Sequence, residues 1–96
     1  MQNDFFEWDD DKAETNLRKH GVSFDEACTV FDDVFVITQT DNRNDYGELR
    51  KYTIGMSSHG RILVVVWTQR RNRYRIISAY IPEPNQRKGY EKKRYR

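Results

Sequence analysis

The sequence predicts an α+β fold: two N-terminal helices packed on a four-stranded antiparallel sheet with a short C-terminal helix, in the order α-α-β-β-β-β-α. Three observations predict it. The chain has 96 residues, enough for one modest hydrophobic core, so we expect a single domain over residues 1–96. Apolar residues first recur with helical spacing and then alternate as in strands. Short turns join the predicted strands, which favours antiparallel pairing.

The first helix is predicted to follow Asp9, whose side chain can cap it. Gly21 stands where a left-handed residue would end it. Two stripes run along this helix at spacings of three and four residues. The first stripe holds Ala13, Leu17 and His20, and a neighbouring stripe holds Lys12, Asn16 and Lys19.

A second helix is predicted to begin at Ser23, which forms a capping box with Glu26. Val22 and Ala27 stand at the positions of a hydrophobic staple across this helix start. The predicted buried face consists of Phe24, Ala27, Cys28 and Phe31. Because Cys28 is the only cysteine, no internal disulfide can form, and we expect it to be a small buried hydrophobe in a reducing cytoplasm.

Four strands are predicted over residues 34–40, 50–57, 61–69 and 73–80, with a polar loop at 41–48 and turns at 58–60 and 70–72. The third strand is apolar on both faces, which places it at the centre of the sheet. Pro82 and Pro84 end the sheet, and Asn85 can cap a final basic helix over residues 86–95.

Charge is divided unequally along the chain. Residues 1–48 hold 4 Lys+Arg and 13 Asp+Glu, a net charge of −9, whereas residues 49–96 hold 13 and 2, a net charge of +11. This division favours a nucleic-acid binder, although the two halves could instead neutralise each other across the fold. The sequence holds no apolar run long enough for a membrane span and does not begin like a secretory signal, so we expect a cytoplasmic protein that contacts no membrane.

Several segments resemble the BrnT toxins, a branch of the RelE-like toxins, in order from about residue 5 to residue 95. They are residues 6–9, 16–24, 53–55 with 60–61, 63–68 and 75–79. The resemblance implies a RelE-like fold and an endoribonuclease that cleaves mRNA and thereby inhibits translation. It also implies a BrnA-like antitoxin as partner, whose ribbon-helix-helix end would bring the complex to operator DNA.

Two residues depart from the usual pattern of that family. Members commonly have arginine where this chain has Tyr80, and often histidine where it has Trp67. An alternative hypothesis is therefore a weakened or inactive toxin homologue that acts as an antitoxin-binding and DNA co-repressor subunit. A stand-alone RNA-binding protein is a third hypothesis, which the lack of regularly placed surface aromatics disfavours.

Cleavage of RNA without a metal requires cations around the phosphate and groups that transfer protons. We predict that Arg50 and Arg75 clamp the phosphate and that Arg70 assists from the turn. For proton transfer the candidates are His20, Glu48, Tyr80 and the turn residue His59, which the sequence does not rank. Strand alternation places Arg73 and Arg75 on one face and Tyr74, Ser78 and Tyr80 on the other, unless the strand twists or bulges.

Further contacts to RNA are predicted for Lys12, Lys19, Arg61, Thr68, Arg73, Arg87 and Lys88. Several of these candidates have purely structural alternatives. His20 could stabilise a helix end, Tyr80 and Trp67 could be packed in the core, and arginines at strand ends could keep sheet edges soluble. The acidic clusters at residues 9–11 and 32–33 are explained as helix caps, so we predict no metal and no cofactor.

Overall fold

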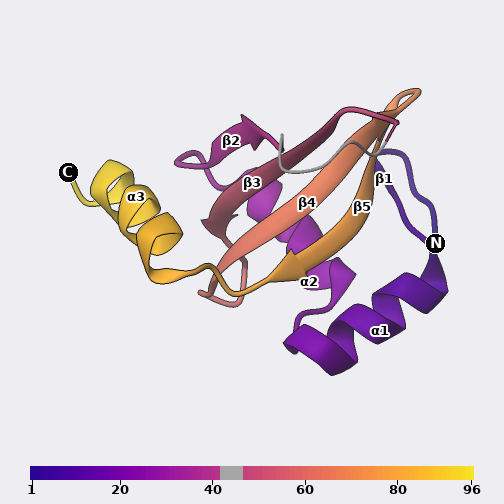
Figure 1. Cartoon of the computed structure of the whole chain (residues 1–96), viewed down its shortest axis with the longest axis horizontal. Coiled ribbons are helices and arrows are strands. Elements are labelled where there is room, and N and C mark those ends of the chain that lie inside the picture. The colour runs from indigo at the N-terminus through magenta and orange to yellow at the C-terminus, as the bar shows by residue number, and fades with distance from the viewer. Residues whose placement is uncertain (42–46) are drawn as a thin grey trace.

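The computed structural model describes residues 1–41 and 47–96, whose strands form one mixed sheet in the order β1-β5-β4-β3-β2 (Figure 1). The helices are α1 (Asp10–His20), α2 (Phe24–Thr29), a short 3-10 helix η1 (Val30–Asp32) and α3 (Pro84–Arg94). The strands are β1 (Phe6–Glu7), β2 (Ile37–Thr40), β3 (Arg50–Met56), β4 (Ile62–Arg70) and β5 (Arg73–Tyr80). The α+β class is confirmed, whereas the four-stranded, wholly antiparallel sheet is a wrong prediction.

The strand missing from that prediction is β1, which pairs in parallel with β5. It spans only two residues, too few to show the alternation by which a strand is recognised in a sequence. Its place is fixed by Phe6, whose ring lies 5.4 Å from the ring of Phe31 and 5.6 Å from that of Tyr74. Aromatic contacts therefore help to hold this short edge strand on the sheet.

Helix α1 begins and ends where the sequence predicts. The side chain of Asp9 accepts hydrogen bonds from the backbone N–H groups of Asp11 and Lys12, and Gly21 ends the helix with a left-handed φ of 67°. Of the two stripes on this helix, the one with Lys12 and Lys19 supplies the buried Asn16, whereas Leu17 on the other stripe is 51% exposed. The amide of Asn16 donates to the carbonyl oxygen of Ala79 at 2.8 Å and accepts from its N–H at 3.1 Å.

Asn16 thereby completes the edge of the sheet. Strand β1 pairs with β5 only at Tyr74 and Arg75, so the backbone of β5 at Ala79 needs another hydrogen-bonding partner. A side-chain amide supplies both a donor and an acceptor, as a strand residue would. The spacing that places Asn16 on one stripe with Lys12 and Lys19 did not reveal this role.

Helix α2 starts at the predicted cap, but only half of the predicted capping box forms. Ser23 Oγ accepts from the N–H of Glu26 at 3.0 Å, whereas the Glu26 carboxylate turns toward the β3–β4 hairpin instead of returning to Ser23. Cys28 is partly buried against the core, and burial raises the pKa of its thiol to about 12. Cys28 therefore contacts the core as predicted, but it is only partly buried.

The core lies on both faces of β4, which is central as predicted. On the face covered by α2, Leu63, Val65 and Trp67 are buried, and the indole of Trp67 donates to Thr53 Oγ1 at 2.9 Å. Trp67 is therefore packed in the core, the structural alternative that the sequence offers for it. A side chain at Gly55 would meet Val30 at 2.8 Å, so this glycine lets η1 approach β3 closely.

Helix α3 packs on the other face and at the end of the molecule away from the β4–β5 hairpin (Figure 1). Pro84 is its first residue and Gln86 Oε1 accepts from the N–H of Glu83, so Asn85 is not its cap. Tyr90 is fully buried and its hydroxyl donates to Asp33. Burial opposes ionisation of Asp33, but hydrogen bonds from Tyr90 and two backbone N–H groups outweigh it and lower its pKa.

The strand before the 41–48 loop is also shorter than predicted. Residues 34–36 form a turn, and β2 begins at Ile37. Most of the predicted loop lies outside the described residues. Within residues 1–41 and 47–96, no helix combines the length and the apolar character that crossing a membrane requires.

Candidate functional site

Three predicted site residues lie in one row across the sheet. Arg50 on β3 is paired with Thr68 on β4, and Thr68 is paired with Arg75 on β5. Residues paired across neighbouring strands point to the same face, so all three side chains leave the sheet together. The Cα atoms of the two arginines are two strand spacings apart, about 10 Å. Two guanidinium groups can therefore approach one phosphate from opposite sides of Thr68.

Two more arginines extend this row along the strands. Arg70 is paired with Arg73, and each lies two residues beyond a member of the row on its own strand. Since side chains two residues apart in a strand share a face, they project to the same side. We call the set Arg50, Thr68, Arg70, Arg73 and Arg75 the arginine face.

A β-bulge corrects the alternation that the sequence predicts for β5. Ser78 is paired with Val66 but Ile76 with Trp67, so Ile77 is an extra residue on β5. Val66 and Thr68 share a face of β4, and their partners Ser78 and Arg75 consequently share it too. Tyr80, two residues after Ser78, also lies on this face. The bulge therefore places Tyr80 on the same face of β5 as Arg73 and Arg75, which regular alternation would not allow.

Carboxylates hold the guanidinium groups of the arginine face. Glu48 lies 3.6 Å from Nη2 of Arg50 and 3.6 Å from Nη2 of Arg70. Glu7 on β1 lies 2.8 Å from Nη1 of Arg75, with 19% and 27% of the two side chains exposed. Thr68 Oγ1 donates to the carbonyl oxygen of Leu49 at 2.7 Å, which fixes the segment that carries Glu48. The arginines are thus oriented before any ligand arrives.

The other predicted proton-transfer residues lie at a distance from this row. The ring of His20, in the last turn of α1, lies 5.9 Å from the ring of Tyr80. Tyr80 follows Arg75 by five residues, roughly 15 Å along β5. Glu48 is therefore the predicted proton-transfer candidate that directly contacts the arginine face, and His20 and Tyr80 form a separate pair.

The two lysines predicted to contact RNA, Lys12 and Lys19, line a groove between α1 and β5. Its volume is about 320 Å³, and His20 and Ser78 line it as well. Asp9 and Asp11 also line it, so opposite charges meet in this groove. Ser78 lies both here and on the face of Arg75, which places the groove and the arginine face at neighbouring parts of β5.

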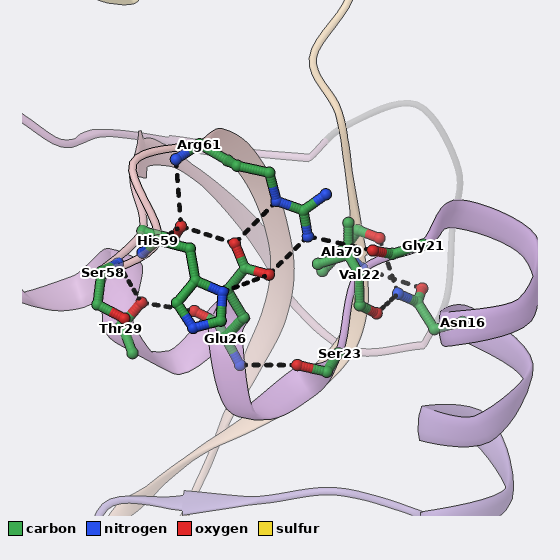
Figure 2. A network of polar contacts seen from close by, with 11 residues as sticks. Asn16, Gly21, Val22, Ser23, Glu26, Thr29, Ser58, His59, Arg61 and Ala79 are labelled. Atoms are coloured by element: carbon green, nitrogen blue, oxygen red, sulfur yellow. Dashed lines mark hydrogen bonds and ion pairs between the residues drawn. The ribbon is translucent and has the colours of Figure 1, made fainter.

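Arg61 belongs to a different environment (Figure 2). Its Nε donates to Glu26 Oε2 at 2.9 Å and its Nη2 to the carbonyl oxygen of Gly21 at 3.1 Å. Ser57 Oγ donates to the same Glu26 oxygen, and Nδ1 of His59 lies 3.4 Å from the other one. The hydrogen bond from Arg61 is the main cause that lowers the pKa of Glu26 to about 2, against the opposing effect of burial.

Sequence reasoning missed this network because Glu26 had a local explanation as part of a capping box. The network joins α2 to the β3–β4 hairpin, and Arg61 stands at the start of β4, away from the arginine face at its end. Arg87 and Lys88 lie on α3 and are exposed, with Arg87 Nε 3.5 Å from Glu91. Contacts of these three residues to RNA stay predictions, and the fold gathers none of them with the arginine face.

Metal-binding side chains do not cluster in the part of the chain that the structure describes. There, no three or more histidine, cysteine, aspartate or glutamate residues come together in a way that could hold an ion. Asp9, from one of the two acidic clusters, acts as a helix cap. Backbone hydrogen bonds from Lys12 and Asp11 lower the pKa of its carboxyl.

The chain is similar to known proteins in its sequence and in its fold. The family model described as "Ribonuclease toxin, BrnT, of type II toxin-antitoxin system" matches residues 8–84. The crystal structure of the ribonuclease toxin BrnT of Brucella abortus is similar in fold, with a TM-score of 0.60 and 19% sequence identity. That similarity covers 82% of this chain and 97% of the Brucella chain. No curated protein sequence matches this chain.

Proposed function

The chain belongs to the BrnT family of ribonuclease toxins of type II toxin–antitoxin systems, and on this premise we propose that it cleaves mRNA on its arginine face without a metal ion. The observation that carries this proposal is the row formed by Arg50, Thr68 and Arg75. The transition state of RNA cleavage places extra negative charge on the phosphate oxygens. Guanidinium groups fixed in advance on either side of one site stabilise such charge without reorganisation.

Glu48 is the best-placed acceptor of the 2′-hydroxyl proton. Its carboxylate lies 3.6 Å from guanidinium nitrogens of both Arg50 and Arg70. A phosphate bound between the arginines would thus place the neighbouring 2′-hydroxyl close to this base. The 2′-oxygen then attacks phosphorus, the bond to the 5′-oxygen breaks, and that oxygen takes a proton from solvent. The products are a 2′,3′-cyclic phosphate and a 5′-hydroxyl.

Cleavage in excess EDTA tests this proposal. Purified protein freed of its partner should cut RNA and leave 2′,3′-cyclic or 3′-phosphate ends. Substituting Arg75 by Ala should lower kcat/KM roughly 10²- to 10³-fold, because a fixed donor to the transition state is lost. Glu48→Gln should lower kcat by a comparable factor, and Arg18→Ala on α1 is the control with the same loss of charge.

Undiminished cleavage by the Arg75→Ala protein would remove that residue from the mechanism. Activity that vanishes in EDTA and returns with Mg²⁺ would instead refute metal independence. We further propose that a BrnA-like antitoxin with a ribbon-helix-helix end neutralises the protein and brings the complex to operator DNA. Co-expression with a ribbon-helix-helix protein encoded beside it should restore growth if this partner is correct.

The environment of Tyr80 favours a second candidate function. Its ring packs beside His20 and against the apolar cluster under α3, so it does not substitute for a free cation at that position. A weakened toxin that serves mainly as an antitoxin-binding and co-repressor subunit would fit this environment. Expression without a partner distinguishes the two, because an active nuclease arrests growth whereas the weakened form leaves growth unaffected.

A further inference from the structure

A cationic cavity lies at the Arg70 and Arg73 end of the arginine face, where the β4–β5 hairpin meets β1. Its volume is about 320 Å³, and it is lined by Gln2, Glu7, Arg70, Arg71 and Arg73. Three arginines and one glutamate therefore line the cavity, an excess of two positive charges. Arg71 is absent from the site predicted from the sequence.

Among the described residues, Arg70 also lies 3.6 Å from Glu48, a carboxylate outside the cavity that it shares with Arg50. The carboxylate of Glu7 is already bound to Arg75, at 2.8 Å. Arg73 Nε donates to the backbone carbonyl oxygen of Asn3 at 2.6 Å, a contact that fixes the side chain without cancelling its charge. A cavity of this kind favours an anionic ligand with several acceptor oxygens.

Arg71 occupies a position that favours glycine. Its φ is 54°, in the left-handed region, at the turn between β4 and β5. The side-chain amide of Gln69 donates to the carbonyl oxygens of Arg71 at 3.1 Å and of Arg73 at 3.2 Å, which secures the turn in this conformation. A side chain kept in a strained backbone conformation is an indication of function, because glycine there would fold more easily.

The spacing of the cavity relative to the Arg50–Thr68–Arg75 row fits a nucleic-acid backbone. Arg70 and Arg73 lie two residues beyond that row, about 6.6 Å along the strands. This separation is comparable to that of successive phosphates in an extended single strand. We propose that the cavity is a second phosphate subsite, which binds the RNA backbone beside the phosphate held by Arg50 and Arg75. The proposal rests on the function proposed above and assigns Arg71 to substrate binding.

The test uses the Arg71→Gly protein, because glycine removes the guanidinium and suits the left-handed turn. The probes are a dinucleotide and a hexanucleotide whose 2′-oxygens are methylated, so that neither can be cleaved. Affinity is measured by fluorescence anisotropy over a range of salt concentrations. Arg18→Ala, which removes an exposed arginine of α1, is the matched control, and thermal unfolding verifies that both variants are folded.

We expect Arg71→Gly to weaken hexanucleotide binding about tenfold and to lower the salt slope by about 1, the effects of losing one charged phosphate contact. Dinucleotide binding and the control should match the unchanged protein. Equal losses for both lengths, or a loss no larger than that of Arg18→Ala, would overturn the subsite. If binding depends on Arg71 but the protein cuts no RNA, the proposed nuclease activity is refuted and the subsite is not.

Discussion

The two ends of β4 carry arginines in contrasting environments. Arg61, just before the strand, binds the carboxylate of Glu26, which is 4% exposed. Arg70, the last residue of the strand, is 52% exposed and lies 3.6 Å from the partly exposed Glu48. The same residue type therefore joins two elements at one end and keeps half of its side chain accessible to solvent at the other. The two arginines differ because the carboxylate that each one contacts is buried to a different degree, which the sequence around each arginine does not reveal.

The largest effect on stability is expected at the buried end. Arg61→Ala should lower the free energy of unfolding by about 2 to 3 kcal/mol, because it leaves the charge of Glu26 buried without its main partner. The matched substitution Arg70→Ala should cost no more than about 0.5 kcal/mol, since exposed ion pairs contribute little. Urea unfolding of both proteins measures the difference. Equal losses in the free energy of unfolding from the two substitutions would contradict the expected contrast between the two ends.

The ion pair of Arg61 and Glu26 should also make the stability of the fold depend on pH in acid. The pKa of Glu26 is about 2 in the folded protein, against a reference value of 4.5, so its ionised form stabilises the fold above pH 4.5. That contribution, at most roughly 3 kcal/mol, should be lost as the pH falls from 4.5 toward 2. Unfolding measured across this range should be less pH-dependent in Glu26→Gln. An identical acid dependence in both proteins would contradict the assignment.

The smallest stability change is expected at the exposed end. Glu48→Gln should alter the free energy of unfolding by less than about 0.5 kcal/mol, because its pairs with Arg50 and Arg70 are long and accessible. Binding of a 2′-methylated RNA should nevertheless tighten several-fold, since two guanidinium groups lose a competing anion. Anisotropy titrations measure this gain. Weaker binding would indicate that Glu48 mainly orients the arginines.

Local signals in the sequence predicted most of the fold. Asp9, Ser23 and Gly21 act as caps because capping depends on a few neighbouring residues. The apolar run of β4 likewise predicted a central strand, since only a strand covered on both faces can bury it. The fold features that escaped prediction depend on distant contacts: Phe6 of β1 packs against aromatic rings from other elements, and Asn16 is buried because it bonds the backbone of Ala79 at the edge of β5 that β1 does not reach.

The candidate site was also predicted only in part, because local patterns place some of its residues and distant contacts place the others. Alternation placed Arg73 and Arg75 on one face, and pairing then brought Arg50 and Thr68 beside them. Whether Tyr80 shares that face depended on the bulge at Ile77, which one strand's sequence does not specify. The role of Arg61 depended on Glu26, 35 residues away along the chain. Residue types predicted the chemistry, whereas long-range partners decide which arginines are accessible.

The most direct test of the account observes the arginine side chains themselves. The Nε–H signals of ¹⁵N-labelled protein would be followed by NMR while a 2′-methylated hexanucleotide is added. We expect the signals of Arg50 and Arg75 to shift as phosphate binds them, while the signal of Arg61, bound to Glu26, stays in place. Shifts at Arg61 with none at Arg50 or Arg75 would contradict it.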